Sequence, residues 1–303
     1  NTVKFSVIVP LFNTNKEDNE AFEKKLLGGS NQVGGMILET VIKNIELLKE
    51  KLDAVSKSIS GTQNYIYDIN IIWKKNKIIT IDETTENIPS EIIQRTNSSG
   101  ILLKSNRGAL INAGVQIALN NSSDYVIIHD SNLIPNEELI LEYFNYPENP
   151  INISSVDENY KYDGNQEPEN VKLGIIKINK MQYLLSFGYP NDMWGTGYED
   201  YVFMERLNKL SISVNDIINP GNIYKITDQS DEEKTITNTL AKHQISYMDE
   251  YYLSKSTIGI NQSYWYNITQ TYNINNNINI YSVDLDYTQL LPIINNDIIK
   301  EIT

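Results

Sequence analysis

The stretch VKFSVIVPLF, residues 3–12, decides the class of fold that the rest of the sequence has to complete. It is rich in β-branched residues and closes with Pro10, Leu11 and Phe12. A nearly continuous apolar run of this length is typical of a parallel strand that is buried on both faces. The sequence therefore predicts a buried strand that leads into a loop close to Pro10.

Strands and helices alternate along the chain beyond this first strand. The expected elements are, in order, a strand at 3–12, a helix at 36–59, strands at 64–81 and 100–104, a helix at 107–119, a strand at 124–135, a strand followed by a helix within 171–189, a helix at 198–210 and two short strands within 211–227. This alternation predicts an α/β fold with a doubly wound, mostly parallel sheet flanked by helices. Because ligands bind outside the carboxyl ends of the strands in such sheets, we expect the active site after Pro10 and after Ile128.

The composition limits the partners and the chemistry. The 303 residues carry a formal net charge of −14, which disfavours a nucleic-acid partner because phosphate-backbone binding depends on clustered Lys and Arg. No apolar run approaches the roughly 20 residues that span a bilayer, so we expect no transmembrane segment. Cysteine is absent, so any metal must have oxygen or nitrogen ligands. A start at Asn1 is compatible with a fragment of a secretory-pathway, viral or bacterial protein, and localisation stays open.

The segment HDSN, residues 129–132, carries the first candidate for chemistry. A buried strand delivers Asp130 and Asn132 to the sheet edge, and we expect their side chains on the same side by the period-two alternation of strands. Two hard oxygen ligands could then face one divalent cation, which would neutralise charge on a diphosphate. A strand-end Asp is also a common turn or cap residue, and this alternative stays open. His129 should point to the opposite face, where we expect a hydrogen-bonded core residue.

The segment WGTGYED, residues 194–200, is the second candidate. A loop punctuated by glycines runs into a helix with Glu199 and Asp200 in its first turn. Trp194 offers a flat face on which a sugar ring could stack, and a carboxylate could accept the proton of an attacking hydroxyl. The alternative is that the two acidic residues only complement the helix dipole.

These segments together resemble the β-1,4-galactosyltransferase family, whose fold is the nucleotide-sugar-binding α/β arrangement called GT-A. The resemblance extends over residues 5–230 with an insertion in the first third, and its last segment is the most specific. The four matching segments, in order, are FSVIVPLFN at 5–13, SNRGALINAGVQIAL at 105–119, YVIIHDSNLIP at 125–135 and FGYPNDMWGTGYEDYVFMERL at 187–207.

The resemblance implies roles for individual residues on the donor side of the site. Residues 10–12 would lie along the nucleotide base, and Arg107 would lie near the donor ribose or phosphates. Asp130 and Asn132 would contact the nucleotide and a divalent cation, manganese or magnesium.

On the acceptor side, the resemblance implies that Trp194, Glu199 and Asp200 border the acceptor sugar. Asp200 occupies the position of the family's catalytic base, and Glu199 precedes it.

The sequence departs from the family pattern at several positions. The usual Asp-x-Asp appears as Asp130-Ser131-Asn132, and Lys225 and Asp228 stand where the family supplies Met and His metal ligands. Asn132 and Asp228 could hold the cation through oxygens, or Lys225 could itself supply positive charge to the diphosphate. Thr196 replaces a tryptophan of the family's mobile loop, which leaves the transferred sugar open.

The expected function is an inverting transfer of galactose, or of a related hexose or N-acetylhexosamine, from a UDP-sugar to a glycan or glycosylated-protein acceptor. Two alternatives remain: a transferase of the same fold with another donor sugar, and an inactive relative that binds glycans. We expect residues 1–230 to form the catalytic domain and residues 231–303 a C-terminal extension packed on or covering it. His243, in this extension, is expected at the surface.

Overall fold

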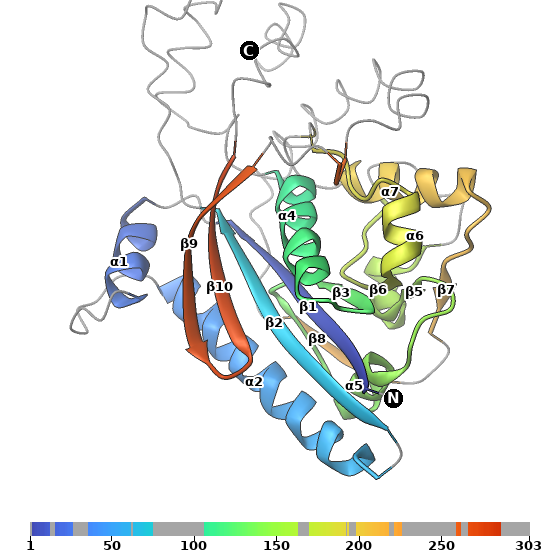
Figure 1. The fold of residues 1–303 in the computed structure, drawn as a ribbon, viewed down its shortest axis with the longest axis horizontal. Coiled ribbons are helices and arrows are strands. Elements are labelled where there is room, and N and C mark those ends of the chain that lie inside the picture. The colour runs from blue at the N-terminus through green and yellow to red at the C-terminus, as the bar shows by residue number, and fades with distance from the viewer. Residues whose placement is uncertain are drawn as a thin grey trace, which may run out of the picture.

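The computed structural model describes residues 2–12, 16–26, 36–61, 63–74, 106–162, 170–191, 193, 198–217, 221–225, 259–261 and 266–285. Within these residues, one large sheet has eight strands in the order β7-β5-β6-β3-β1-β2-β10-β9 (Figure 1). The strands are β1 (Thr2–Phe12), β2 (Asn64–Lys74), β3 (Tyr125–His129), β5 (Ile151–Asn152), β6 (Ile175–Asn179), β7 (Asn215–Asp216), β9 (Tyr266–Asn275) and β10 (Ile278–Leu285).

The centre of the sheet is parallel, as the sequence predicts. Strand β1 pairs in parallel with β2 on one side and with β3 on the other, and β2 pairs in parallel with β10. Antiparallel pairing begins towards the edges, where β6 pairs with β3 and β9 pairs with β10. The carboxyl ends of β1, β2 and β3 therefore meet at one edge, where ligands bind in such sheets.

Helices cover both faces of the sheet (Figure 1). Along β1, Val7 and Val9 pack in the core that includes α2 (Met36–Ile59), whereas Ile8 packs in the core that includes α4 (Arg107–Asn120). All three valine and isoleucine side chains are fully buried, and each such burial stabilises the fold by about 1.5–3 kcal/mol. Further helices are α1 (Lys16–Leu26), α5 (Glu137–Leu141), α6 (Lys180–Leu185) and α7 (Tyr198–Lys209), with short 3-10 helices at Glu142–Phe144, Ile153–Val156 and Glu158–Tyr160.

Helix α4 lies unusually close to the sheet. Its first turn is capped by Asn106, whose side chain accepts a hydrogen bond from the amide of Ala109 at 2.9 Å. A Cβ atom at Gly114 would collide with Ile8 and Ile72, so only glycine permits this approach. The close packing fixes the helix N-terminus at the carboxyl edge of the sheet.

The single strand expected at 124–135 is wrong. Strand β3 ends at His129, residues 130–132 lie outside any strand, and β4 (Leu133–Pro135) belongs to a separate two-stranded sheet with β8 (Ile223–Lys225). The chain turns because the backbone N–H of Leu133 donates to the carbonyl of Asp130 at 3.1 Å. The two short strands expected within 211–227 are confirmed as β7 and β8, and the helix at 198–210 as α7.

Two parts of the fold lie where the sequence pattern gave no assignment. Helix α1 is mostly charged, and its Phe22 packs edge-on against Trp73 of β2, with ring centroids 5.1 Å apart. Strands β9 and β10 form a hairpin that extends the main sheet beyond β2. Residues 266–285 therefore share a sheet with the first half of the chain, and the domain division at residue 230 stays a prediction.

Other expectations lie outside the described residues, among them the strand at 100–104 and the end of the strand at 75–81. Across the described residues, none of the helices is both long and apolar enough to cross a membrane.

Candidate active site

A cluster of three charged side chains lies where α4 and α7 begin. Arg107 starts α4, and Glu199 and Asp200 stand in the first turn of α7. The Arg107 Nη1 atom lies 2.7 Å from Oδ1 of Asp200 and 3.3 Å from Oε1 of Glu199. Both carboxylate residues are only 4% exposed. The fold therefore brings together residues that are more than 90 positions apart in the sequence.

Three groups donate hydrogen bonds to the carboxylate of Asp200. Besides Arg107, the hydroxyl of Tyr189 donates to Oδ1 at 3.0 Å and the backbone N–H of Leu173 donates to Oδ2 at 3.1 Å. Arg107 also donates through Nη2 to the carbonyl of Leu173 at 3.0 Å. A carboxylate with this many donors and a guanidinium partner is held in one orientation.

The electrostatics of the cluster favour charged Arg107. Burial alone would lower the pKa of its guanidinium, but the negative charges of Asp200 and Glu199 raise that pKa well above the usual value. Burial, together with the nearby charge of Asp200, raises the pKa of the Tyr189 hydroxyl well above its usual value. Tyr189 consequently stays protonated and remains a hydrogen-bond donor at any working pH.

The local sequence explains why α7 places the two carboxylates here. Its apolar residues Val202, Phe203 and Leu207 are buried, so the helix has one fixed face towards the core. The acidic first turn lies at the positive end of the helix dipole, which favours negative charge. The dipole role and the catalytic role predicted for Glu199 and Asp200 are thus compatible.

Pro10 and Leu11 are buried at the end of β1, where we expected the nucleotide base. Arg107 was expected near the donor ribose or phosphates, and the structure shows it paired with the carboxylates of Glu199 and Asp200, which were expected on the acceptor side. Its contact with the donor stays a prediction.

Asp130 and Asn132 lie in a turn, so the expected strand alternation across them is wrong. Oδ1 of Asp130 accepts a hydrogen bond from the backbone N–H of Asn132 at 2.8 Å, and the backbone N–H of Asp130 donates to Gly174 at 2.7 Å. The turn interpretation left open by the sequence therefore describes the local structure. Both side chains are half-buried rather than enclosed.

The turn offers part of a cation site. The Asp130 carboxylate and the Asn132 amide are hard oxygen donors of the kind that manganese and magnesium prefer. No group of three or more His, Cys, Asp or Glu side chains that could hold a metal ion occurs in the described part of the chain. The two residues thus fit a cation that takes its remaining ligands from a diphosphate or from elsewhere in the chain.

Lys225, expected at a metal-ligand position of the family, is placed by its backbone. Strand β8 pairs with β4 so that Lys225 stands opposite Leu133, the residue directly after Asn132. The chain segment that carries Lys225 therefore adjoins the Asp130–Asn132 turn. Several expected site residues lie outside the described part of the chain. These are the side chains of Lys225 and Phe12, and all of Trp194, Thr196, Asp228 and His243.

His129 is a buried core residue, as predicted. It is 1% exposed, and its Nδ1 lies 2.8 Å from the carbonyl oxygen of Asp130. Burial lowers the pKa of its imidazole to about 4, against the opposing effect of that backbone contact.

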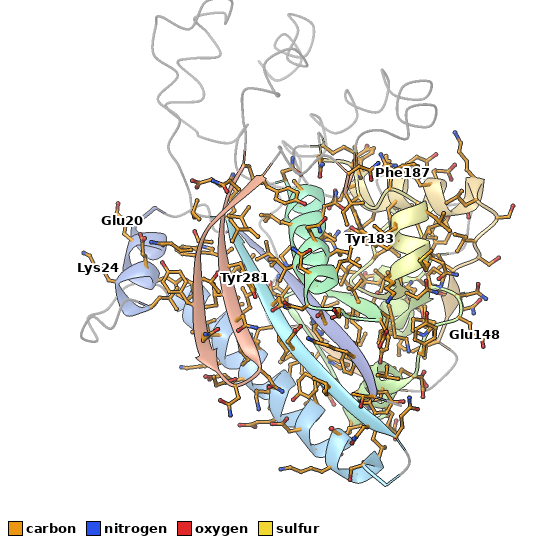
Figure 2. The ribbon with its side chains drawn as sticks, viewed as in Figure 1. Glu20, Lys24, Glu148, Tyr183, Phe187 and Tyr281 are labelled. Atoms are coloured by element: carbon orange, nitrogen blue, oxygen red, sulfur yellow. The ribbon has the colours of Figure 1, made fainter. Side chains whose placement is uncertain are left out.

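Sequence reasoning missed the residues that fix the segment 187–191. Asn112 of α4 donates through Nδ2 to the carbonyl of Tyr189 at 2.7 Å, and its Oδ1 accepts from the amide of Tyr189 at 3.2 Å. The Tyr183 hydroxyl also donates to this Oδ1, at 2.6 Å. Figure 2 labels Tyr183 and Phe187 on the side of the sheet covered by α4 and α6. An asparagine inside the apolar stripe of α4 was the one available sequence signal.

The architecture is that of a GT-A-type glycosyltransferase: a large, mostly parallel sheet with helices on both faces and polar groups at its carboxyl edge. Two solved structures of Drosophila β-1,4-galactosyltransferase 7 have a fold similar to that of this chain. One, a variant crystallised with manganese, UDP-Gal and xylobiose, has a TM-score of 0.58 and 18% identity, with 94% of both chains covered. The catalytic domain with xylobiose has a TM-score of 0.54 and 18% identity, covering 97% of this chain and all of that one.

Sequence comparison also finds similarity to β-1,4-galactosyltransferase 7. The chain is 36% identical over 104 residues to β-1,4-galactosyltransferase 7 of Mus musculus and Homo sapiens, which is 34% of this chain and 29% of each relative. It is 32% identical over 114 residues to the Drosophila melanogaster protein. The matched segment thus spans about a third of these relatives' length, and no family model matches. The predicted resemblance to β-1,4-galactosyltransferases is confirmed in both sequence and fold.

Proposed function

We propose that this chain is the catalytic domain of a glycosyltransferase that moves a sugar from a UDP-sugar to the hydroxyl of a sugar acceptor. The observation that carries the proposal is the buried Asp200 carboxylate, held by Arg107, Tyr189 and Leu173 at the start of α7. Similarity to β-1,4-galactosyltransferase 7, whose fly variant was crystallised with UDP-Gal and xylobiose, supports the same class of donor and acceptor.

In the proposed reaction Asp200 is the general base. The O–H bond of the acceptor breaks as its proton passes to the Asp200 carboxylate, and the acceptor oxygen forms a bond to the anomeric carbon. The bond from that carbon to the diphosphate breaks at the same time, and its electron pair leaves with the UDP. Attack opposite the leaving group inverts the anomeric configuration.

The donor side is proposed at the turn between β3 and β4. Asp130 and Asn132 would hold a divalent cation there, and such a cation neutralises charge on a departing diphosphate. Lys225 is the alternative source of positive charge, because β8 brings its backbone alongside Leu133. Residues 10–12 would line the nucleotide base at the end of β1.

The test is nucleotide release from a panel of UDP- and GDP-sugars, with and without simple sugar acceptors. Acceptor-dependent release from one donor is the expected result. Repeating the assay with manganese, with magnesium and with chelator separates a cation at Asp130 and Asn132 from Lys225. Silence across the panel would contradict the enzyme assignment.

A glycan-binding protein without turnover is the second candidate, and the neutral amide at Asn132 favours it. It predicts binding of a sugar acceptor in calorimetry together with silence in the donor panel. The same two measurements therefore separate the two functions.

A further inference from the structure

The hydroxyl of Tyr189 belongs to the proposed active site, although Tyr189 was not recognised as a site residue from the sequence. The side chain is fully buried and its ring stacks on Phe203 with centroids 4.3 Å apart. The guanidinium carbon of Arg107 lies over the Tyr189 ring, 5.8 Å from its centroid. The one proton of the hydroxyl is directed to Oδ1 of Asp200 at 3.0 Å.

Hydrogen-bond capacity distinguishes the two oxygens of Asp200. A carboxylate oxygen accepts about two hydrogen bonds in its plane. Oδ1 already has two donors, Arg107 at 2.7 Å and Tyr189 at 3.0 Å. Among the described residues, Oδ2 has one donor, the backbone N–H of Leu173 at 3.1 Å. Within this part of the chain, the remaining acceptor position is therefore on Oδ2.

The backbone of Tyr189 is fixed as firmly as its ring. Asn112 contacts both its N–H and its carbonyl. The two preceding residues, Phe187 and Gly188, have φ angles of 61° and 67°, a region that a bulky residue such as Phe187 seldom adopts. Arg206 donates to the Gly188 carbonyl at 2.6 Å. A strained segment this well supported is typical of a functional site.

We propose that Tyr189 is a positioning residue that, together with Arg107, occupies Oδ1 of Asp200 and leaves Oδ2 as the oxygen that accepts the acceptor's proton. The inference rests on the proposed function, because it assigns a task to one atom of the proposed base. In the described part of the chain, the charged and titratable groups that face Asp200 are Arg107 of α4, Glu199 of α7, Tyr189, and Tyr160 of the 3-10 helix Glu158–Tyr160.

The deciding variant is Tyr189→Phe, which removes one oxygen and keeps the ring against Phe203. The Asp200 carboxylate then loses one of the two donors to its Oδ1 atom. Because the carboxylate is held less firmly, kcat falls about tenfold while the donor KM stays nearly constant.

Tyr125→Phe is the matched control. Tyr125 is also fully buried, stacks on Phe5 at 5.2 Å and donates one hydrogen bond, to the carbonyl of Tyr143 at 2.6 Å. It lies at the amino-terminal end of β3, away from Asp200. We expect a similar change in melting temperature in both variants and a reduced kcat only in Tyr189→Phe. An equal kcat in the two variants would overturn the proposal.

A second measurement does not depend on activity. In protein labelled with ¹³C at the aspartate carboxyl, the Asp200 resonance is identified by its loss in Asp200→Asn. At one fixed pH, its chemical shift should change in Tyr189→Phe relative to the wild type. It should stay unchanged in Tyr125→Phe and in Tyr183→Phe, which removes only the bond to Asn112. An unchanged chemical shift in Tyr189→Phe refutes the role of Tyr189. Silence of the wild type in the donor panel with a changed chemical shift refutes the proposed function instead.

Discussion

The two acidic positions of the proposed site are built in opposite ways. Asp200 is held by groups 93, 27 and 11 residues away in the sequence, and it is nearly inaccessible. The carboxylate of Asp130 accepts from the amide two residues further on, and Asp130 is half-buried. The carboxylate on the proposed acceptor side is thus held by distant parts of the fold, whereas the carboxylate contact on the proposed donor side is local to one turn.

The largest effect should come from removing the proposed base. Asp200→Asn keeps the size of the side chain but cannot accept a proton, so kcat should fall about 10³-fold. The variant also leaves Arg107 buried with only Glu199, which should lower the free energy of unfolding by about 3 kcal/mol. Transfer kinetics, donor binding by calorimetry and thermal melting measure the three quantities.

Glu205→Gln, on the same helix but beside Asn208, is the control and should retain normal kcat. Full activity in Asp200→Asn would contradict the role of Asp200 as the base.

Substitutions in the turn of Asp130 and Asn132 should have a smaller effect than Asp200→Asn, and they should act by changing how the turn binds the divalent cation. Asp130→Asn should raise the donor KM about tenfold, and Asn132→Asp should tighten manganese binding about tenfold, because affinity follows the number of charged ligands. Titration with manganese, with and without UDP, measures the second effect.

The chain contains a matched turn for comparison. Oδ1 of Asp157 accepts from the amide of Asn159 at 2.9 Å, in the same arrangement as Asp130 and Asn132. Asp157→Asn and Asn159→Asp should leave donor KM and manganese binding unchanged. Equal effects at both turns would show that the donor side is elsewhere.

A smaller effect should follow from disturbing how α4 supports the acceptor side. A Cβ atom at Gly108 would collide with the carbonyl oxygen of Pro190, next to Tyr189. Gly108→Ala should therefore lower the free energy of unfolding by about 1–3 kcal/mol and reduce kcat several-fold. Gly61→Ala is the control, because nothing lies within 4 Å of its added Cβ. Denaturant unfolding and kcat of the two variants check the difference.

The smallest effect concerns a buried charge outside both acidic positions. Burial lowers the pKa of Lys177, on β6, to about 8, below the 10.5 of an exposed lysine. Between those pH values the unfolded chain binds more protons than the folded chain, so this lysine makes stability rise with pH. Lys177 contributes at most about 1.4 kcal/mol per pH unit to the slope of the free energy of unfolding against pH.

In Lys177→Met this contribution to the slope should disappear, without any change in the pH dependence of transfer. Urea unfolding of both proteins from pH 7 to 10 measures it. A change in transfer would contradict the placement of Lys177 outside the site.

The sequence predicts those parts of the fold in which one residue pattern dominates. The apolar spacing of α2 is confirmed by buried Val41, Ile45 and Leu48, and the buried strands and α7 follow in the same way. Helix α1 was not predicted because its sequence is mostly charged, and the core contacts of its Phe22 and Leu26 are with residues distant in the sequence, such as Trp73. Strand β9 was not predicted because its mostly exposed Asn, Thr and Tyr residues carry little hydrophobic contrast. Strand β10 was not predicted although Ile278, Ile280, Val283 and Leu285 are buried along it.

In the candidate site, too, positions set by local sequence were predicted and contacts between distant residues were not. The local segments predict Asp130 near the end of a buried strand and Asp200 in the first turn of a helix, and the structure has Asp130 directly after β3 and Asp200 in the first turn of α7. The partner of Arg107 could not be predicted, because a sequence does not reveal which of several carboxylates a guanidinium will meet. The contact of Tyr189 with Asp200 could not be predicted either, because it depends on the backbone turn at residues 187–188.

The hairpin of β9 and β10 has a consequence for biosynthesis. Strand β10 covers the edge of β2, pairing Ile278 with Ile69 and Ser282 with Trp73. A ribosome therefore releases β2 long before its neighbour exists, and the nascent chain carries an unpaired apolar edge through most of translation. Closing so distant a pair is slow, so we expect chaperone dependence during synthesis and aggregation of chains truncated before residue 266.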